Sequence, residues 1–194
     1  MEKCLVFIDS GFLSKVSKHF GGGISLRYDL LKFAKNLCGK ENLIFKQLFY
    51  YTAPPFQTKS PSKEDRKRKE NYDKFVEKIG VSNEITIREG RVQRVKIDGS
   101  FVYKQKGVDT LLTMDLMDVP LKNSSIKQII LIASDSDFVP IVKRLEELGI
   151  NIILYTYFDR KRGSMFSTSN KLLDSVSKYV QLKLEDFNKS KSFF

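Results

Sequence analysis

The stretch IILIASDSDFVPIVKRLEELG, residues 129–149, joins a run of aliphatic residues to a helical pattern through two aspartates. The aliphatic run is typical of a buried strand, and the apolar spacing after Phe138 predicts a helix that ends at Gly149. Asp135 and Asp137 lie at the junction. Two carboxylates this close to a buried strand are unfavourable unless a positive group lies near them. The stretch therefore indicates an α/β unit that presents acidic side chains at a strand end.

The rest of the chain alternates strand and helix patterns in the same way. Strands are predicted at residues 4–9, 43–52, 126–133 and 150–157, and helices at residues 63–79, 107–120, 138–148 and 171–180. Another helix is predicted after Ser25, which can cap it, with apolar positions up to Leu37. Ser62 and Asp65 match a capping box, and Pro120 is expected to end its helix. This alternation predicts an α/β fold of three layers, α/β/α, with a mostly parallel central sheet.

Residues 84–105, EITIREGRVQRVKIDGSFVYKQ, are rich in β-branched and aromatic residues. The pair Asp98-Gly99 is a signal for a two-residue hairpin turn. We therefore expect an inserted basic β-hairpin that carries Arg91, Arg94 and Lys96.

The charge is strongly positive and unevenly distributed. The formal net charge is +11, and residues 59–106 hold fourteen Lys/Arg against eight Asp/Glu. Such a basic segment favours a polyanionic partner. The alternative is a solvated basic surface that keeps the protein soluble.

Length and composition limit the function classes. A chain of 194 residues fits one domain, expected at residues 1–187, with residues 188–194 as a flexible C-terminal tail. The single histidine and two cysteines argue against a structural zinc site and against catalysis by a histidine pair. No secretion signal is recognised and no apolar run could span a bilayer, so a cytoplasmic protein is expected.

Acidic residues recur where strands end or helices begin. Asp9 ends the first predicted strand, Asp109 starts a helix, and Asp135 and Asp137 follow a later strand. Ligands of open parallel sheets bind outside the carboxyl ends of the strands, so we expect these four side chains to form a catalytic site. Grouped carboxylates repel one another, and Mg²⁺ or Mn²⁺ would relieve this repulsion. The chemistry indicated is metal-dependent hydrolysis of a phosphodiester, although each aspartate could instead cap a helix or close a turn.

The motifs VFID, GRVQRVKIDGSFVYKQKGVDTLLTMDLMD, IILIASDSDFVPIVKRLEELG and KLLDSV occur in this order. Over about residues 4–182, they together resemble the NYN domain family, which is the LabA-like branch of the PIN-like nucleases. The resemblance implies a PIN-like fold, metal-dependent ribonuclease activity, and metal-site acids at Asp9, Asp109, Asp135 and Asp137. Asp115 is a further acid of the family pattern.

The chain departs from this pattern at one position. Members commonly have Asn three residues after the first Asp, where this chain has Phe12. The main alternative to an endoribonuclease is therefore an RNA-binding NYN module with weakened catalysis. A haloacid-dehalogenase-like phosphatase fits less well, because Gly11 stands where a second Asp is needed. A toprim-like site also fits less well, because it usually has a Glu in the earlier motif.

RNA is the expected partner. For the oligomeric state, a homodimer and a monomer are both alternatives. Basic side chains near the carboxylate edge are expected to hold the RNA phosphates. These are Lys106, Arg91, Arg94, Lys96, Arg160, Lys161 and Arg162.

Overall fold

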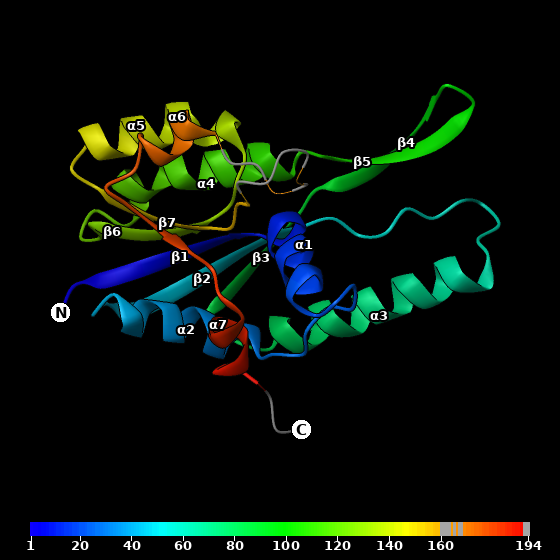
Figure 1. Cartoon of the computed structure of the whole chain (residues 1–194), viewed down its shortest axis with the longest axis horizontal. Coiled ribbons are helices and arrows are strands. Elements are labelled where there is room, and N and C mark those ends of the chain that lie inside the picture. Colours follow the sequence, from blue (N-terminus) through cyan, green and yellow to red (C-terminus); the bar gives the residue numbers. More distant parts are fainter. Residues whose placement is uncertain (160–163, 165, 167–168, 192–194) are drawn as a thin grey trace.

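A six-stranded parallel sheet forms the centre of the computed structural model, which describes residues 1–159, 164, 166 and 169–191 (Figure 1). Its strand order is β3-β2-β1-β6-β7-β8, and every neighbouring pair is parallel. The bounds are β1 Lys3–Asp9, β2 Ile44–Thr52, β3 Ile85–Glu89, β6 Gln128–Ile132, β7 Asn151–Thr156 and β8 Lys178–Gln181. The chain builds outward from β1 through β2 and β3, then returns to β6 on the other side of β1. The direction in which successive strands are added to the sheet therefore reverses between β1 and β6. Open α/β sheets bind their ligands at such a switch point, outside the carboxyl ends of the strands.

Helices cover both faces of this sheet, which confirms the predicted three-layer α/β/α class (Figure 1). One face carries α1 (Ser10–Phe20), α2 (Leu30–Lys40) and α7 (Leu184–Asn188). The other carries α4 (Val108–Lys122), α5 (Val139–Glu147) and the short α6 (Asn170–Leu173). Val6 and Ile8 belong to the first core, whereas Leu5 and Phe7 belong to the second. Successive residues of β1 are thus buried on opposite faces, which explains its unbroken apolar run.

Two elements extend beyond the three layers. The helix α3 (Lys63–Gly80) begins with the predicted capping box of Ser62 and Asp65. The predicted basic hairpin is formed by β4 (Arg91–Ile97) and β5 (Ser100–Lys106), and it projects from the domain (Figure 1). Its turn residues Asp98 and Gly99 have φ angles of 48° and 81°, the left-handed conformations that a tight hairpin turn requires.

Two expected element boundaries are wrong. The helix expected after Ser25 begins at Leu30, because Asp29 caps it by accepting a hydrogen bond of 2.7 Å from the N–H of Lys32. Pro120 does not end α4, which continues to Lys122. A proline this near the end of a helix removes only one backbone hydrogen bond from the last turns.

The segment 171–180 is not one helix. After α6 the chain turns, and Lys178–Gln181 becomes the edge strand β8, paired with β7. The Ser175 hydroxyl donates to the Leu172 carbonyl and satisfies one of the last helical carbonyls. The open edge of β7 then gives Lys178–Gln181 the backbone partners that the ended helix no longer supplies.

The start of the expected tail contacts α2. The N–H of Asp29 donates to the Ser190 carbonyl at 2.8 Å, and the amide of Asn36 donates to the Ser190 hydroxyl at 2.9 Å. The division into a domain and a flexible tail stays a prediction. In the described part of the chain, no helix combines the length and apolar character needed to cross a membrane.

Candidate active site

Asp9 lies at the carboxyl end of β1 and caps the helix α1. Its carboxylate accepts hydrogen bonds from the N–H groups of Gly11 at 2.8 Å and Phe12 at 3.3 Å. These bonds fix the carboxylate at the strand end. The sequence allowed Asp9 to close a turn; the structure instead makes it the cap of α1. Asp9 also lines a cavity.

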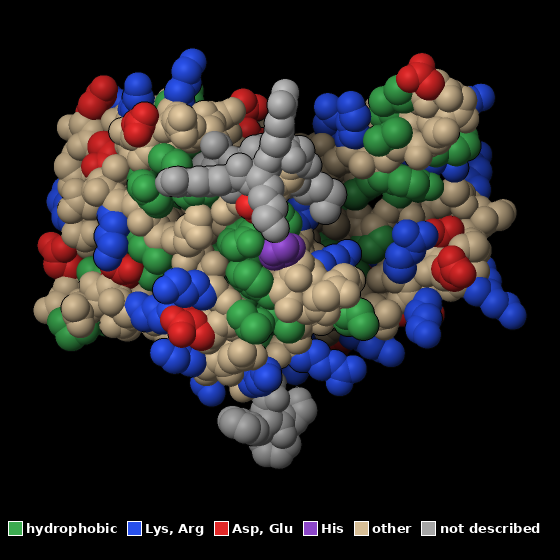
Figure 2. All heavy atoms as spheres, in the orientation of Figure 1, with side chains coloured by type: hydrophobic (Ala, Val, Ile, Leu, Met, Phe, Trp, Pro, Cys, Tyr) green, Lys and Arg blue, Asp and Glu red, His purple; other side chains and the backbone are tan. Residues whose placement is uncertain are grey.

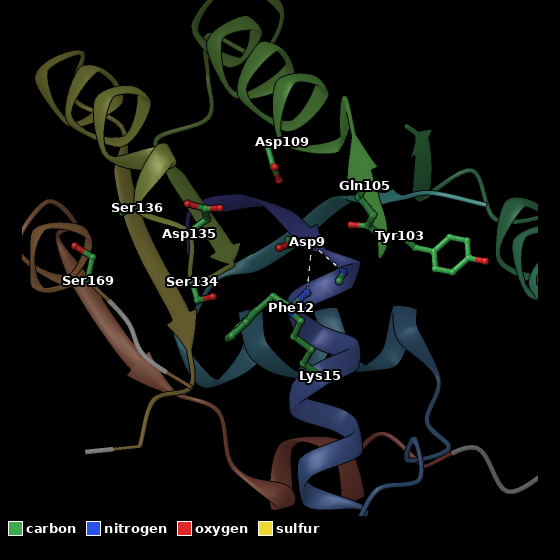
Figure 3. A pocket seen from close by; sticks show the side chains of 11 residues that line it. Asp9, Phe12, Lys15, Tyr103, Gln105, Asp109, Ser134, Asp135, Ser136 and Ser169 are labelled. Atoms are coloured by element: carbon green, nitrogen blue, oxygen red, sulfur yellow. Dashed lines mark hydrogen bonds between the residues drawn. The ribbon is translucent and has the colours of Figure 1, made fainter. Parts of the chain in front are cut away.

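Asp135 and Asp109 approach the same place from the other side of the switch point. Asp135 follows β6 and caps a short 3-10 helix, Ser136–Phe138, by accepting a hydrogen bond of 2.9 Å from the N–H of Asp137. Asp109 lies in the first turn of α4, after Gly107, whose φ of 81° turns the chain from β5 into the helix. Asp9, Asp109 and Asp135 all line one cavity of about 770 Å³ (Figure 3).

The other walls of this cavity come from α1, the hairpin and the loops after β6 and β7. They are Gly11, Phe12, Lys15, Tyr103, Gln105, Ser134, Ser136 and Ser169. A Cβ atom on Gly11 would lie 3.1 Å from Oε1 of Gln105, so the missing side chain lets the hairpin approach α1 closely. The cavity is thus closed on one side by the inserted hairpin.

The electrostatics of the cavity reflect its concentration of carboxylates. Burial raises the pKa of Asp9, and the negative charge of Asp109 raises it further, whereas the two N–H donors and Lys15 lower it. Burial also raises the pKa of Asp109, and the charges of Asp135 and Asp137 add to this increase. The carboxylates therefore interact with one another across the cavity.

The donor set fits a hydrated hard cation. Within the described residues, no group of three or more His, Cys, Asp or Glu lies close enough to bind one ion directly. Magnesium usually keeps several waters and takes only one or two protein carboxylates, so widely spaced aspartates are compatible with it. In the same part of the chain, Asp9, Asp109 and Asp135 form no ion pair with Lys or Arg, which leaves their charges available to a cation.

The remaining predicted site residues in the described part of the chain do not line the carboxylate cavity. Asp137 does not line the cavity, although its charge reaches Asp109. Lys106 and Arg91 line a different cavity, of about 460 Å³, at the base of the hairpin. Arg94 and Lys96 lie farther out on β4. Arg160, Lys161 and Arg162 lie outside the described residues.

Asp115, the further acid of the family pattern, lies away from the cavity. Its carboxylate accepts hydrogen bonds from the Arg88 guanidinium at 2.7 and 2.8 Å and from the Tyr51 hydroxyl at 2.9 Å. These bonds tie α4 to β2 and β3. Asp115 therefore has a structural role in this conformation.

Sequence reasoning missed Lys15, Gln105, Ser134, Ser136 and Ser169 as cavity residues. Lys15 gives a signal only once α1 is known to be a helix, because it then shares a face with Gly11 four residues earlier. Gln105 gives no comparable signal, since its position depends on how the hairpin packs against α1.

Comparison with known proteins agrees with this arrangement. The model of the NYN domain matches residues 3–183. The chain belongs to the NYN domain family. That membership supports a PIN-like nuclease fold, while the LabA-like branch stays a prediction. A search of curated proteins finds no match.

A solved structure shares the fold of this NYN domain. It is a crystal structure of a protein of unknown function from Vibrio parahaemolyticus, with a TM-score of 0.56 and 16% sequence identity. The alignment covers 96% of this chain and 95% of that chain. At this identity the similarity establishes the fold alone.

Proposed function

We propose that this NYN domain is a metal-dependent endoribonuclease that hydrolyses RNA phosphodiester bonds. One observation carries the proposal: Asp9, Asp109 and Asp135 line one cavity at the switch point of the sheet. Carboxylates gathered at such a point, without ion-pair partners in the described chain, are the donor set of a phosphodiester hydrolase that uses a divalent cation.

Asp9, Asp109 and Asp135 would hold a hydrated Mg²⁺ or Mn²⁺, one or two of them directly and the rest through its waters. Asp137 would contribute through water or through the charge it places near Asp109. When bound, such an ion lowers the pKa of a coordinated water and stabilises the negative charge on the phosphate oxygens. The hydrogen bonds from Gly11 and Phe12 keep the Asp9 carboxylate oriented before substrate arrives. This rigidity favours catalysis, because less reorganisation is needed in the transition state.

The chain offers cations for the RNA backbone at two distances from the acids. Lys15 lines the cavity itself and can hold a phosphate oxygen near Asp9. Arg94 and Lys96 on the hairpin would hold phosphates farther along the RNA strand. Arg160, Lys161 and Arg162, outside the described residues, stay proposed phosphate contacts. Lys106 and Arg91 would act at the base of the hairpin, outside the carboxylate cavity.

A cleavage assay tests the proposal. A labelled single-stranded RNA is incubated with the protein and Mn²⁺, with Mg²⁺, and with excess chelator. We expect internal cleavage with either metal and none with chelator. Binding without cleavage under all three conditions would reject the enzyme and leave the alternative function.

That alternative is an RNA-binding module with weakened catalysis, and Phe12 is the observation that favours it. The Phe12 side chain is 6% exposed, packs in the core under α1 and lines the cavity. It supplies an apolar surface where family members commonly have an amide. A protein without that amide can still bind RNA through its basic hairpin.

A further inference from the structure

The pairing register of the hairpin places a row of aromatic and basic side chains on one face. Arg94 pairs with Tyr103, and Lys96 pairs with Phe101. Directly paired residues share a face of an antiparallel ribbon, and residues two apart along a strand share it as well. These four side chains, which we call the hairpin platform, therefore lie on the same face as Gln105.

The hairpin platform begins at the carboxylate cavity. Gln105 and Tyr103 both line that cavity, and the Tyr103 ring points away from Asp9 (Figure 3). Phe101 lies two residues farther out on β5. A strand that leaves the cavity on this side would therefore run along the platform.

The aromatic rings are held in place but stay exposed. The Arg94 guanidinium carbon lies 4.3 Å from the centre of the Phe101 ring and 5.3 Å from that of Phe56. The Phe56 and Tyr103 ring centres are 5.7 Å apart. Even so, Phe101 is 55% exposed and Tyr103 is 56% exposed. Packing inside the domain therefore does not account for these two rings.

The charge around the rings favours a polyanion. Residues 91–106 contain five Lys/Arg and one acidic residue, Asp98 at the turn. Lys and Arg side chains surround the projecting hairpin and extend along α3 (Figure 2). Exposed rings between cations form the usual surface for single-stranded nucleic acid, because bases stack on the rings while cations contact phosphates.

We propose that the hairpin platform is a base-stacking subsite for unpaired RNA nucleotides next to the carboxylate cavity, an inference that rests on the proposed function. Phe101 and Tyr103 supply the stacking surfaces. Arg94 supports the Phe101 ring, and Arg94 and Lys96 both contact the RNA backbone. The subsite determines where along an unpaired strand the RNA sits relative to the acids.

The test uses a uridine-rich single-stranded RNA that carries one 2-aminopurine, titrated with protein in excess chelator so that the RNA stays intact. Stacking on a ring quenches the fluorescence of this base. The variants are Phe101→Leu and Tyr103→Leu, which keep apolar volume but remove the ring. Phe101→Tyr keeps a ring at the same position, and Tyr179→Leu removes a ring on β8 that is 49% exposed and distant in sequence from the platform.

We expect the parent protein to quench the fluorescence, and Phe101→Leu and Tyr103→Leu each to weaken binding roughly fivefold or more, since base stacking is worth about 1–3 kcal/mol per base. The dependence of affinity on salt should stay unchanged, because no charge is removed. Phe101→Tyr and Tyr179→Leu should bind and quench like the parent. An abasic oligonucleotide of the same length should bind the parent and the leucine variants equally.

The proposal would be overturned if the leucine variants bound the RNA as tightly as the parent. It would also be overturned if the leucine variants lost as much affinity for the abasic strand as for the RNA. Cleavage with Mn²⁺, measured separately, distinguishes the two proposals. Cleavage by a protein whose leucine variants bind normally would reject only the platform. Ring-dependent quenching by a protein that never cleaves would reject only the nuclease.

Discussion

Asp109, in the first turn of α4, raises the pKa of Asp9 at the end of β1, although one hundred residues separate them in the chain. Burial is the larger cause of the raised pKa, and the charge of Asp109 adds to it. This relationship shows that the two carboxylates share one electrostatic environment. It gives a direct way to measure the arrangement of the site.

Replacing Asp109 should therefore lower the pKa of Asp9. Asp109→Asn removes a negative charge but keeps the size of the side chain, so the Asp9 carboxylate becomes easier to ionise. NMR titration of the carboxyl carbon of Asp9, without metal, measures the change. Asp118→Asn is the matched control, because Asp118 lies on the same helix but pairs with Lys122. An equal shift in both variants would contradict the coupling.

The stability of the metal-free protein should depend on pH through Asp9. Its pKa in the folded state lies above the ordinary value of 3.8, so ionised Asp9 destabilises the fold. This destabilisation is complete above the raised pKa and disappears as the pH falls below the ordinary value. Asp9→Asn keeps a helix cap and should therefore unfold at a higher temperature than the parent near neutral pH.

The measurement is the melting temperature of both proteins across the acid range, in chelator. The difference should shrink as the pH falls. A difference that stays constant down to low pH would mean that Asp9→Asn acts through packing or capping and not through charge.

Phe12→Asn separates a catalytic role of the missing amide from a structural role of the ring. Phe12 is buried, so the substitution should cost about 3 kcal/mol or more in the free energy of unfolding, through a lost apolar side chain and a buried amide. If the amide also orients water or substrate, single-turnover cleavage should be faster once corrected for the folded fraction. Phe12→Leu, which refills most of the volume, controls for the loss of the ring. A slower rate in Phe12→Asn than in Phe12→Leu would contradict an orienting amide.

Charge reversal on the hairpin should weaken RNA binding. Arg94→Glu and Lys96→Glu each remove one phosphate contact, so affinity should fall and its dependence on salt should become less steep. Lys143→Glu, at an exposed position of α5, changes the net charge by the same amount away from the hairpin. Binding curves at several salt concentrations compare the three variants. An equal loss in Lys143→Glu would show that only total charge matters.

The sequence predicted those parts of the fold that depend on local patterns. The apolar run before Asp9, the Ser62 capping box and the Asp98-Gly99 turn all appear where expected. Each is determined by residues within a few positions, through burial, a cap or a left-handed turn conformation.

The sequence did not predict what depends on distant contacts. The helix α1 contains Gly11 and Val16, which favour helices weakly, and it forms because its buried face packs on the sheet and Asp9 caps it. The strand β8 exists because the edge of β7 is open to it. Gln105 reaches the cavity only through the approach of the hairpin to Gly11. The position of the acids at strand ends could be predicted, whereas the walls around them could not.

The most direct test of the central claim is the rate of manganese-dependent RNA cleavage by Asp135→Asn. The asparagine oxygen can still accept the hydrogen bond from the N–H of Asp137, so the short helix after β6 should form and the protein should fold. Loss of one carboxylate from the cavity should slow cleavage by more than about 100-fold, since changes beyond the direct ligands already cost 10- to 100-fold in metal sites. Cleavage by Asp135→Asn at the parental rate would contradict the account and leave Asp135 as a helix cap alone.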